Sequence, residues 1–217
     1  QIYYNQMVDG KDRKARIAKH SDKTKDMPKN GLIVFCTFYE GYVNGQFTGK
    51  KYDKTMTGDF MYKGNSVLTK LVFKLKPDVS AEIKEKYPDT HTVKLYPNSV
   101  LFTDLEINRL YTHEISPPVL HSGDIPVRLG YVVRSSNVLA RHDVINCNVH
   151  IRENIREKVE DVSSVEKIEW TLLNKPTVDG IAALKKQYAE ENFTSIPMKY
   201  NPVDFSLNDG DYLKPNV

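Results

Sequence analysis

Runs of alternating or β-branched apolar residues fill much of the first two thirds of the chain, and they constrain its fold more than any other feature. The runs cover residues 31–38, 66–75, 91–96, 99–105, 128–135 and 144–151. A two-residue period is typical of strands with one buried face. Turn-forming pairs such as Asn44-Gly45 and Pro97-Asn98 separate the runs. The pattern predicts a mainly β (α+β) fold, with an antiparallel sandwich or jelly roll as its architecture.

The length of 217 residues suits one enlarged domain, or one domain with an appendage. We expect a jelly-roll core over residues 1–150, interrupted by a long excursion at 39–65 that is rich in Gly, Tyr and Lys. Residues 151–217 have a different character, with helix-compatible patterns at 154–159 and 178–192. We expect this part to be an appendage that packs on the core.

Composition excludes several classes of protein. The chain has 40% hydrophobic and 27% charged residues and only two cysteines, Cys36 and Cys147. It lacks the apolar run of about 20 residues that a membrane helix needs and the disulfide framework of a small secreted domain. We therefore expect an intracellular protein, in the cytoplasm or nucleus, with no membrane association. Because the sequence begins with Gln1, we expect further N-terminal residues in the native protein. Nothing in the sequence indicates an oligomeric state.

The formal charge of +3 permits a nucleic-acid partner without requiring one. The basic residues are concentrated in the stretch 11–30, which has eight Lys or Arg against three Asp. Such a stretch suits the neighbourhood of an anionic ligand. No phosphate-binding glycine motif follows a strand, and no His or Cys cluster has zinc spacing.

His20 and Asp22 are separated by one residue at the end of a strand-compatible segment. Side chains at positions i and i+2 of an extended chain share a face, so both could bind one metal ion. For a third ligand we favour His113, which follows the run 99–105, over His121, which lies in a Pro-rich loop. Two His and one carboxylate form the facial triad of non-haem Fe(II) oxygenases. The alternative interpretation of His-x-Asp is a solvated turn.

Arg128 and Arg134 stand six residues apart in an apolar run and therefore share a face. Arginine binds carboxylates through paired, charge-assisted hydrogen bonds, so this arrangement suits an organic dicarboxylate. The alternative is a pair of surface residues that form ion pairs.

The order His20-x-Asp22, then the segment 93–102, then His113, then Arg128-x5-Arg134 resembles the AlkB-like branch of the Fe(II)- and 2-oxoglutarate-dependent dioxygenases. The resemblance covers roughly residues 3–136 and implies a double-stranded β-helix, a form of jelly roll. It implies that His20, Asp22 and His113 hold Fe(II), that Arg128 binds the distal carboxylate of 2-oxoglutarate, and that Arg134 lies near its chelating end. Asn5 matches a further cosubstrate-binding position.

The resemblance implies dioxygen as co-substrate and oxidation of a C–H bond, by hydroxylation or oxidative N-demethylation, on a nucleobase in DNA or RNA. The chain departs from the family pattern at Met7, Gly130 and Val132, and has Thr24 where repair members have a second acid, although Asp26 is close. Candidate substrate-binding residues are Thr24, Asp26, Tyr42 and Tyr52. The two tyrosines belong to the excursion, where aromatic side chains could stack on a flipped base or anchor the loop to its own core.

Two other functions remain open at this point. One is a 2-oxoglutarate-dependent hydroxylase of a protein side chain or small molecule. The other is a non-catalytic jelly-roll binding protein, which the three departures from the family pattern favour.

Overall fold

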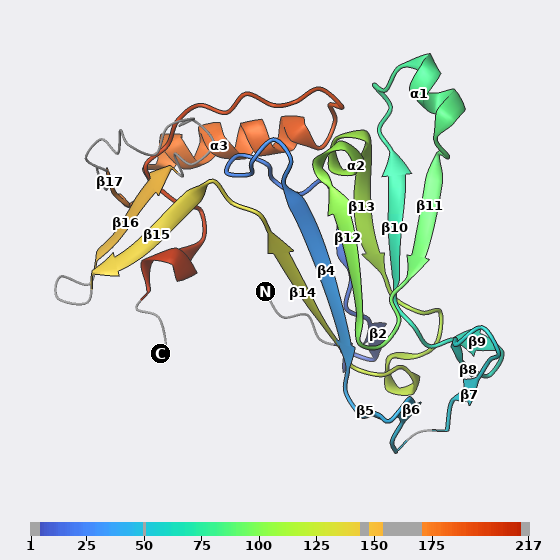
Figure 1. Ribbon diagram of the computed structural model, residues 1–217. Helices are drawn as coiled ribbons and strands as arrows, with labels where there is room; N and C mark the ends of the chain where they lie inside the picture. Colours follow the sequence, from blue (N-terminus) through green and yellow to red (C-terminus); the bar gives the residue numbers. More distant parts are fainter. Residues whose placement is uncertain (1–4, 50, 144–147, 154–170, 214–217) are drawn as a thin grey trace, which may run out of the picture.

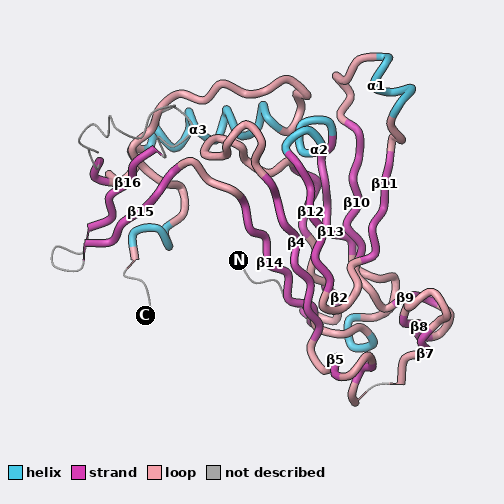
Figure 2. The backbone as a smooth tube through the Cα atoms, in the orientation of Figure 1, coloured by secondary structure: helices cyan, strands magenta, loops and turns pink. Residues whose placement is uncertain are grey.

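The computed structural model describes residues 5–49, 51–143, 148–153 and 171–213. The fold is mainly β with several antiparallel sheets, as the sequence predicts, and the sheets do not close on themselves. Two larger sheets pack face to face, and a third sheet projects to one side beside a C-terminal helix (Figures 1 and 2). Among the described residues, no helix is both long enough and apolar enough to cross a membrane.

The first large sheet has four strands in the order β11-β10-β13-β3. They are β11 (Thr90–Lys94), β10 (Lys70–Leu75), β13 (Tyr111–Ser116) and β3 (Ile17–His20). Every neighbouring pair is antiparallel. The register of β3 on β13 shifts between His113 and Ile115, so a bulge or similar irregularity lies beside His113.

The second large sheet has the order β12-β4-β14, formed by β12 (Ser99–Asp104), β4 (Leu32–Tyr39) and β14 (Arg128–Arg134). Alternate side chains of β4 are buried, because the inner face of the strand meets the other sheet. Ile33 and Phe35 of β4 share one hydrophobic core with Leu71 and Phe73 of β10 and with Ile115 of β13. This core holds the two sheets together.

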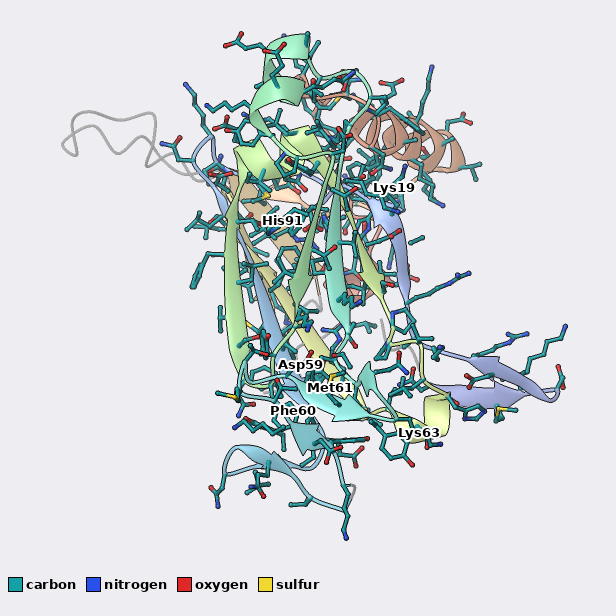
Figure 3. All side chains as sticks on the ribbon, turned by 90° about the vertical axis from the view of Figure 1, so that its right-hand side faces the viewer. Lys19, Asp59, Phe60, Met61, Lys63 and His91 are labelled. Carbon is teal, nitrogen blue, oxygen red and sulfur yellow. The ribbon has the colours of Figure 1, made fainter. Side chains whose placement is uncertain are left out.

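The excursion at 39–65 folds into small hairpins at one end of the sandwich. Its strands are β5 (Tyr42–Val43), β6 (Gln46–Phe47), β7 (Asp53–Lys54) and β8 (Phe60–Tyr62), and β8 also pairs with β9 (Asn65–Ser66). Asn44 and Gly45 both have positive φ, which a two-residue hairpin turn of this type requires. Figure 3 shows Asp59, Phe60, Met61 and Lys63 at the end of the sheets far from Lys19, which lies on β3 near the C-terminal helix.

Short elements complete the sandwich. They are the hairpin β1 (Gln6–Val8) and β2 (Lys11–Arg13), the helices α1 (Ala81–Lys86) and α2 (Leu105–Leu110), and the 3-10 turn η1 (Ser122–Asp124). Helix α2 separates β12 from β13, and it includes Asn108 and Arg109. Asp104 caps this helix by accepting from the Ile107 amide.

The C-terminal part contains the third sheet, β15 (Val138–Asp143), β16 (Asn148–Glu153) and β17 (Thr171–Leu172), followed by α3 (Val178–Glu191) and η3 (Asp209–Tyr212). The helix expected at 178–192 is therefore present, with Thr177 as its N-cap. Strand β16 runs across the expected boundary between residues 150 and 151. The helix expected at 154–159 lies outside the described residues.

Candidate metal centre

His20 and His113 face each other across two neighbouring antiparallel strands. His20 is the last residue of β3, and it is the register partner of His113 in β13. Directly opposite residues of an antiparallel pair project from the same face of the sheet. The two imidazole ring centroids are 4.4 Å apart. Strand pairing alone therefore brings together two nitrogen ligands that are far apart in the sequence.

Asp22 completes the group. It lies two residues beyond His20, and its Oδ2 is 3.9 Å from Nε2 of His113. Ligand atoms of His20, Asp22 and His113 all lie within 4.8 Å of one another, and within the described ranges this is the one group of three or more His, Cys, Asp or Glu that converges in this way. His121 was the other candidate for the third ligand. Its Nε2 lies instead 3.7 Å from Oδ1 of Asp12.

The carboxylate of Asp22 is buried, with only 6% of the residue exposed. Among the described residues its Oδ2 has no hydrogen-bond partner, and its Oδ1 is 3.6 Å from Nη1 of Arg134. A buried carboxylate oxygen without a partner is costly, because the protein does not replace the water that the oxygen loses. A divalent cation between Asp22 and the two histidines would replace that water, so the donor set fits a metal ion.

Both histidines can present a lone pair to a metal ion. Burial lowers the pKa of His113 to about 4, although the charge of Asp22 opposes the shift, so its ring is neutral at pH 7. Nδ1 of His20 lies 2.9 Å from the carbonyl oxygen of Ala18, which can only accept a hydrogen bond. The proton of a neutral His20 ring is therefore on Nδ1, which leaves Nε2 free to bind.

A cavity of about 630 Å³ contains the three residues, and Arg128 and Arg134 also line it. A larger cavity of about 850 Å³ lies between the third sheet, α3 and the C-terminal tail, with neither His nor Cys among its described lining residues. The chemistry of the donor atoms therefore places the candidate site in the smaller cavity.

Arg128 and Arg134 face inward on β14, opposite Tyr39 and Ile33 of β4, as their spacing predicts. Burial lowers the pKa of Arg128, and within the described part of the chain no acidic side chain forms an ion pair with it. Its guanidinium lies over Gly130, where a methyl group would come within 2.5 Å of Nη1. A partly buried cation beside a candidate metal centre is a suitable partner for an anionic ligand.

The structure does not bring the other predicted site residues to this cavity. Oδ1 of Asn5 accepts from the Ala15 amide, 2.7 Å away. Thr24 binds Glu191, and Asp26 pairs with Lys25 at 2.5 Å and borders the larger cavity. Tyr42 and Tyr52 pack in a second hydrophobic cluster at the base of the excursion. The packing alternative for the excursion aromatics therefore agrees with where these rings lie.

Sequence reasoning missed two asparagines that bind the loop around Asp22. Oδ1 of Asn108 accepts from the Asp22 amide, and its Nδ2 donates to the Asp22 carbonyl oxygen, both over 2.8 Å. Asn192 accepts from the Ser21 amide over 2.7 Å. The sequence gives no signal for Asn108, because Glu106 and Arg109 are also polar in the segment 105–110. It gives none for Asn192, because the contact of that residue depends on where α3 packs.

Comparison with protein-family models, with curated proteins and with solved structures finds no match to this chain. Its function must therefore be inferred from the chemistry of its own residues.

Proposed function

We propose that this protein is an Fe(II)- and 2-oxoglutarate-dependent dioxygenase of the AlkB-like type. The observation that carries the proposal is the convergence of His20, Asp22 and His113 in one cavity with a partly buried arginine, Arg128. Two His and one carboxylate would hold Fe(II) and leave open positions for a cosubstrate and dioxygen. Arg128, which is partly buried, would provide a partner for a cosubstrate carboxylate.

The strand order supports a double-stranded β-helix. From β3 onward the large strands visit the two sheets in turn: β3 is in the four-stranded sheet, β4 in the other, β10 and β11 in the first, β12 in the second, β13 in the first and β14 in the second. Chain winding of this kind is typical of jelly rolls. With this winding the two histidines lie on one sheet and the two arginines on the sheet that faces it, while Asp22 follows the end of β3.

Iron and 2-oxoglutarate, when bound, supply the oxidation of a substrate C–H bond by dioxygen, with succinate and carbon dioxide as the other products. The side chains of the protein would bind the cosubstrate and orient the residues that hold the metal ion. Arg128 would pair with the distal carboxylate of the cosubstrate, and Nη1 of Arg134 lies 3.6 Å from Oδ1 of Asp22. Phe35 and Phe73 pack against the His113 ring, at centroid distances of 5.3 and 6.0 Å, and fix its orientation. Both rings also exclude water from that side of the metal centre.

The proposed substrate is a nucleobase in DNA or RNA. Lys19, Lys23 and Arg134 line the same cavity, and Asp22 is the one acidic residue in its described lining. After the metal ion neutralises Asp22 and Arg128 binds the cosubstrate, three cationic side chains remain for a negatively charged substrate. Phosphates of a nucleic-acid chain meet that requirement, whereas a neutral small molecule does not.

The direct test is succinate formation from 2-oxoglutarate by the full chain with Fe(II) and air, in the presence and absence of an alkylated oligonucleotide. We expect oligonucleotide-dependent succinate with the wild type and none with His20→Ala. Equal succinate from both would contradict the metal assignment. Oligonucleotide affinity should fall as salt rises, and Lys23→Gln should reduce the log–log slope by about one if Lys23 binds a phosphate.

A further inference from the structure

The segment that carries Asp22 lies beyond the end of β3, so the sheet does not fix its backbone. Side chains from distant parts of the chain do so instead. The amide of Ser21 donates to Oδ1 of Asn192 over 2.7 Å, and the amide of Thr24 donates to Oε2 of Glu191 over 3.3 Å. Two amides that flank Asp22 are therefore bound to the last residue of α3 and to the residue that follows it.

Glu191 is itself buried and hydrogen-bonded through both its side chain and its backbone. It is 6% exposed, and its carboxylate accepts hydrogen bonds from the hydroxyl groups of Thr24 and Tyr200. Its backbone oxygen accepts from Nζ of Lys76 over 2.7 Å, and Lys76 also donates to the Thr194 carbonyl oxygen over 2.8 Å. Lys76 follows β10 and is 2% exposed. A buried cation at this end of α3 satisfies terminal carbonyl groups and complements the helix dipole.

These contacts form a continuous connection from the core to the metal ligand. Lys76 fixes the C-terminal end of α3, that end fixes the amides of Ser21 and Thr24, and Asp22 lies between them. Figure 1 shows α3 above the third sheet, with one end beside the loop that enters β4. The contacts are polar and directional, whereas general packing of an appendage would need only apolar area.

We propose that the end of α3 is part of the metal centre, with Asn192 and Glu191 as positioning residues that set the place of the Asp22 carboxylate through the loop backbone. This inference rests on the proposed metal site. Metal affinity depends on ligand atoms being held close to their bonding positions, and loss of an outer contact typically lowers affinity by 10–100-fold. Residues after 150 are then needed for metal binding.

The test is the affinity of the full-length protein for Mn²⁺, read from the electron paramagnetic resonance signal of the free ion, which needs no turnover. Asn192→Leu removes the acceptor for the Ser21 amide at similar size, and Asn192→Asp retains an acceptor oxygen at the same position. Thr177→Ala is the matched control, because it removes a cap at the opposite end of α3, where Thr177 accepts from the Gly180 amide.

We expect Asn192→Leu to weaken Mn²⁺ binding by at least tenfold, Asn192→Asp to restore most of it, and Thr177→Ala to leave it within twofold of the wild type. Thr24→Val removes one donor to Glu191 and should also weaken Mn²⁺ binding. This variant provides the test if Asn192→Leu does not fold. Unchanged affinity in a folded Asn192→Leu or Thr24→Val protein, or an equal loss in Thr177→Ala, would overturn the inference.

Failure of the metal site itself is distinguishable from failure of this inference. In that case the wild type would not bind Mn²⁺, or would bind it no more tightly than His20→Ala does. A wild type that binds tightly, with His20→Ala weakened and Asn192→Leu unchanged, would retain the proposed function and remove only the role of α3.

Discussion

The guanidinium of Arg128 lies over the bare Cα of Gly130, two residues farther along the same face of β14. A Cβ at position 130 would lie 2.5 Å from Nη1 and 2.8 Å from Nη2 of Arg128. The glycine therefore leaves the space that the arginine occupies. In the sequence Gly130 is a departure from the family pattern, and in the structure it determines how Arg128 lies against the cavity.

Gly130→Ala should therefore displace the Arg128 guanidinium without disturbing the backbone, because φ at Gly130 is not positive and the crowded atoms belong to the end of a flexible side chain. We expect KM for 2-oxoglutarate to rise several-fold and the melting temperature to change little. Kinetics at varied 2-oxoglutarate check this. Gly210→Ala, where the nearest atom would be 3.6 Å away, is the control and should leave KM unchanged.

Arg128→Met should separate cosubstrate binding from stability. Arg128 is partly buried and has no acidic partner among the described residues, so it loses part of its hydration without compensation, and an apolar side chain of similar length removes that cost. We expect unfolding free energy to stay the same or rise by about 1–2 kcal/mol, while 2-oxoglutarate no longer raises the melting temperature. Arg13→Met, at an exposed position, should retain the ligand-dependent shift. A cosubstrate shift of wild-type size in Arg128→Met would contradict the role of Arg128.

Lys76 should make stability depend on pH in the alkaline range. Burial lowers its pKa from 10.5 to about 8, against opposing effects of Glu191 and Asp78. Between these values the unfolded chain binds more protons than the folded one, so this contribution to stability rises with pH. Between about pH 8 and 10.5, the free energy of unfolding of the wild type should rise by roughly 1–3 kcal/mol relative to that of Lys76→Met. Urea unfolding of both proteins across that range measures the difference, and a constant difference would contradict the expectation.

Tyr52→Phe should lower stability without affecting turnover. The Tyr52 hydroxyl donates to the Asp124 carbonyl oxygen over 3.0 Å, and its ring packs on Phe47 with centroids 5.2 Å apart. Loss of that hydrogen bond costs about 1 kcal/mol. Tyr42→Phe, in the same cluster, should change neither property. A strong loss of substrate affinity in either variant would favour the substrate-binding role that the sequence suggested for these tyrosines.

Strand patterning and local spacing made part of this structure predictable. The burial of alternate residues in β4 follows from the pattern of residues 31–38, and the shared face of Arg128 and Arg134 follows from their spacing. The meeting of His20 with His113 requires a particular strand pairing, which spacing alone does not give. The position of His113 after the run 99–105 favoured it as the third ligand, and the resemblance to a known family implied the same residue, but neither predicted which residues pair between β3 and β13.

The remaining features depend on long-range packing. The excursion aromatics looked suitable for base stacking, but the sequence does not show at which end of the sandwich their hairpins lie. The contact between Ser21 and Asn192 joins residues 171 apart in the sequence. No periodicity or motif encodes such a pair, because it depends on how α3 packs after the sheets have formed.

Anaerobic titration of the protein with Fe(II) and 2-oxoglutarate tests the central claim most directly. We predict a weak visible absorption band that requires both ligands and saturates at one equivalent of iron. It should be absent in His113→Ala and require much more 2-oxoglutarate in Arg128→Met. Failure of the folded wild type to give this band, or an unchanged band in His113→Ala, would contradict the assignment of His20, Asp22 and His113 as an iron centre.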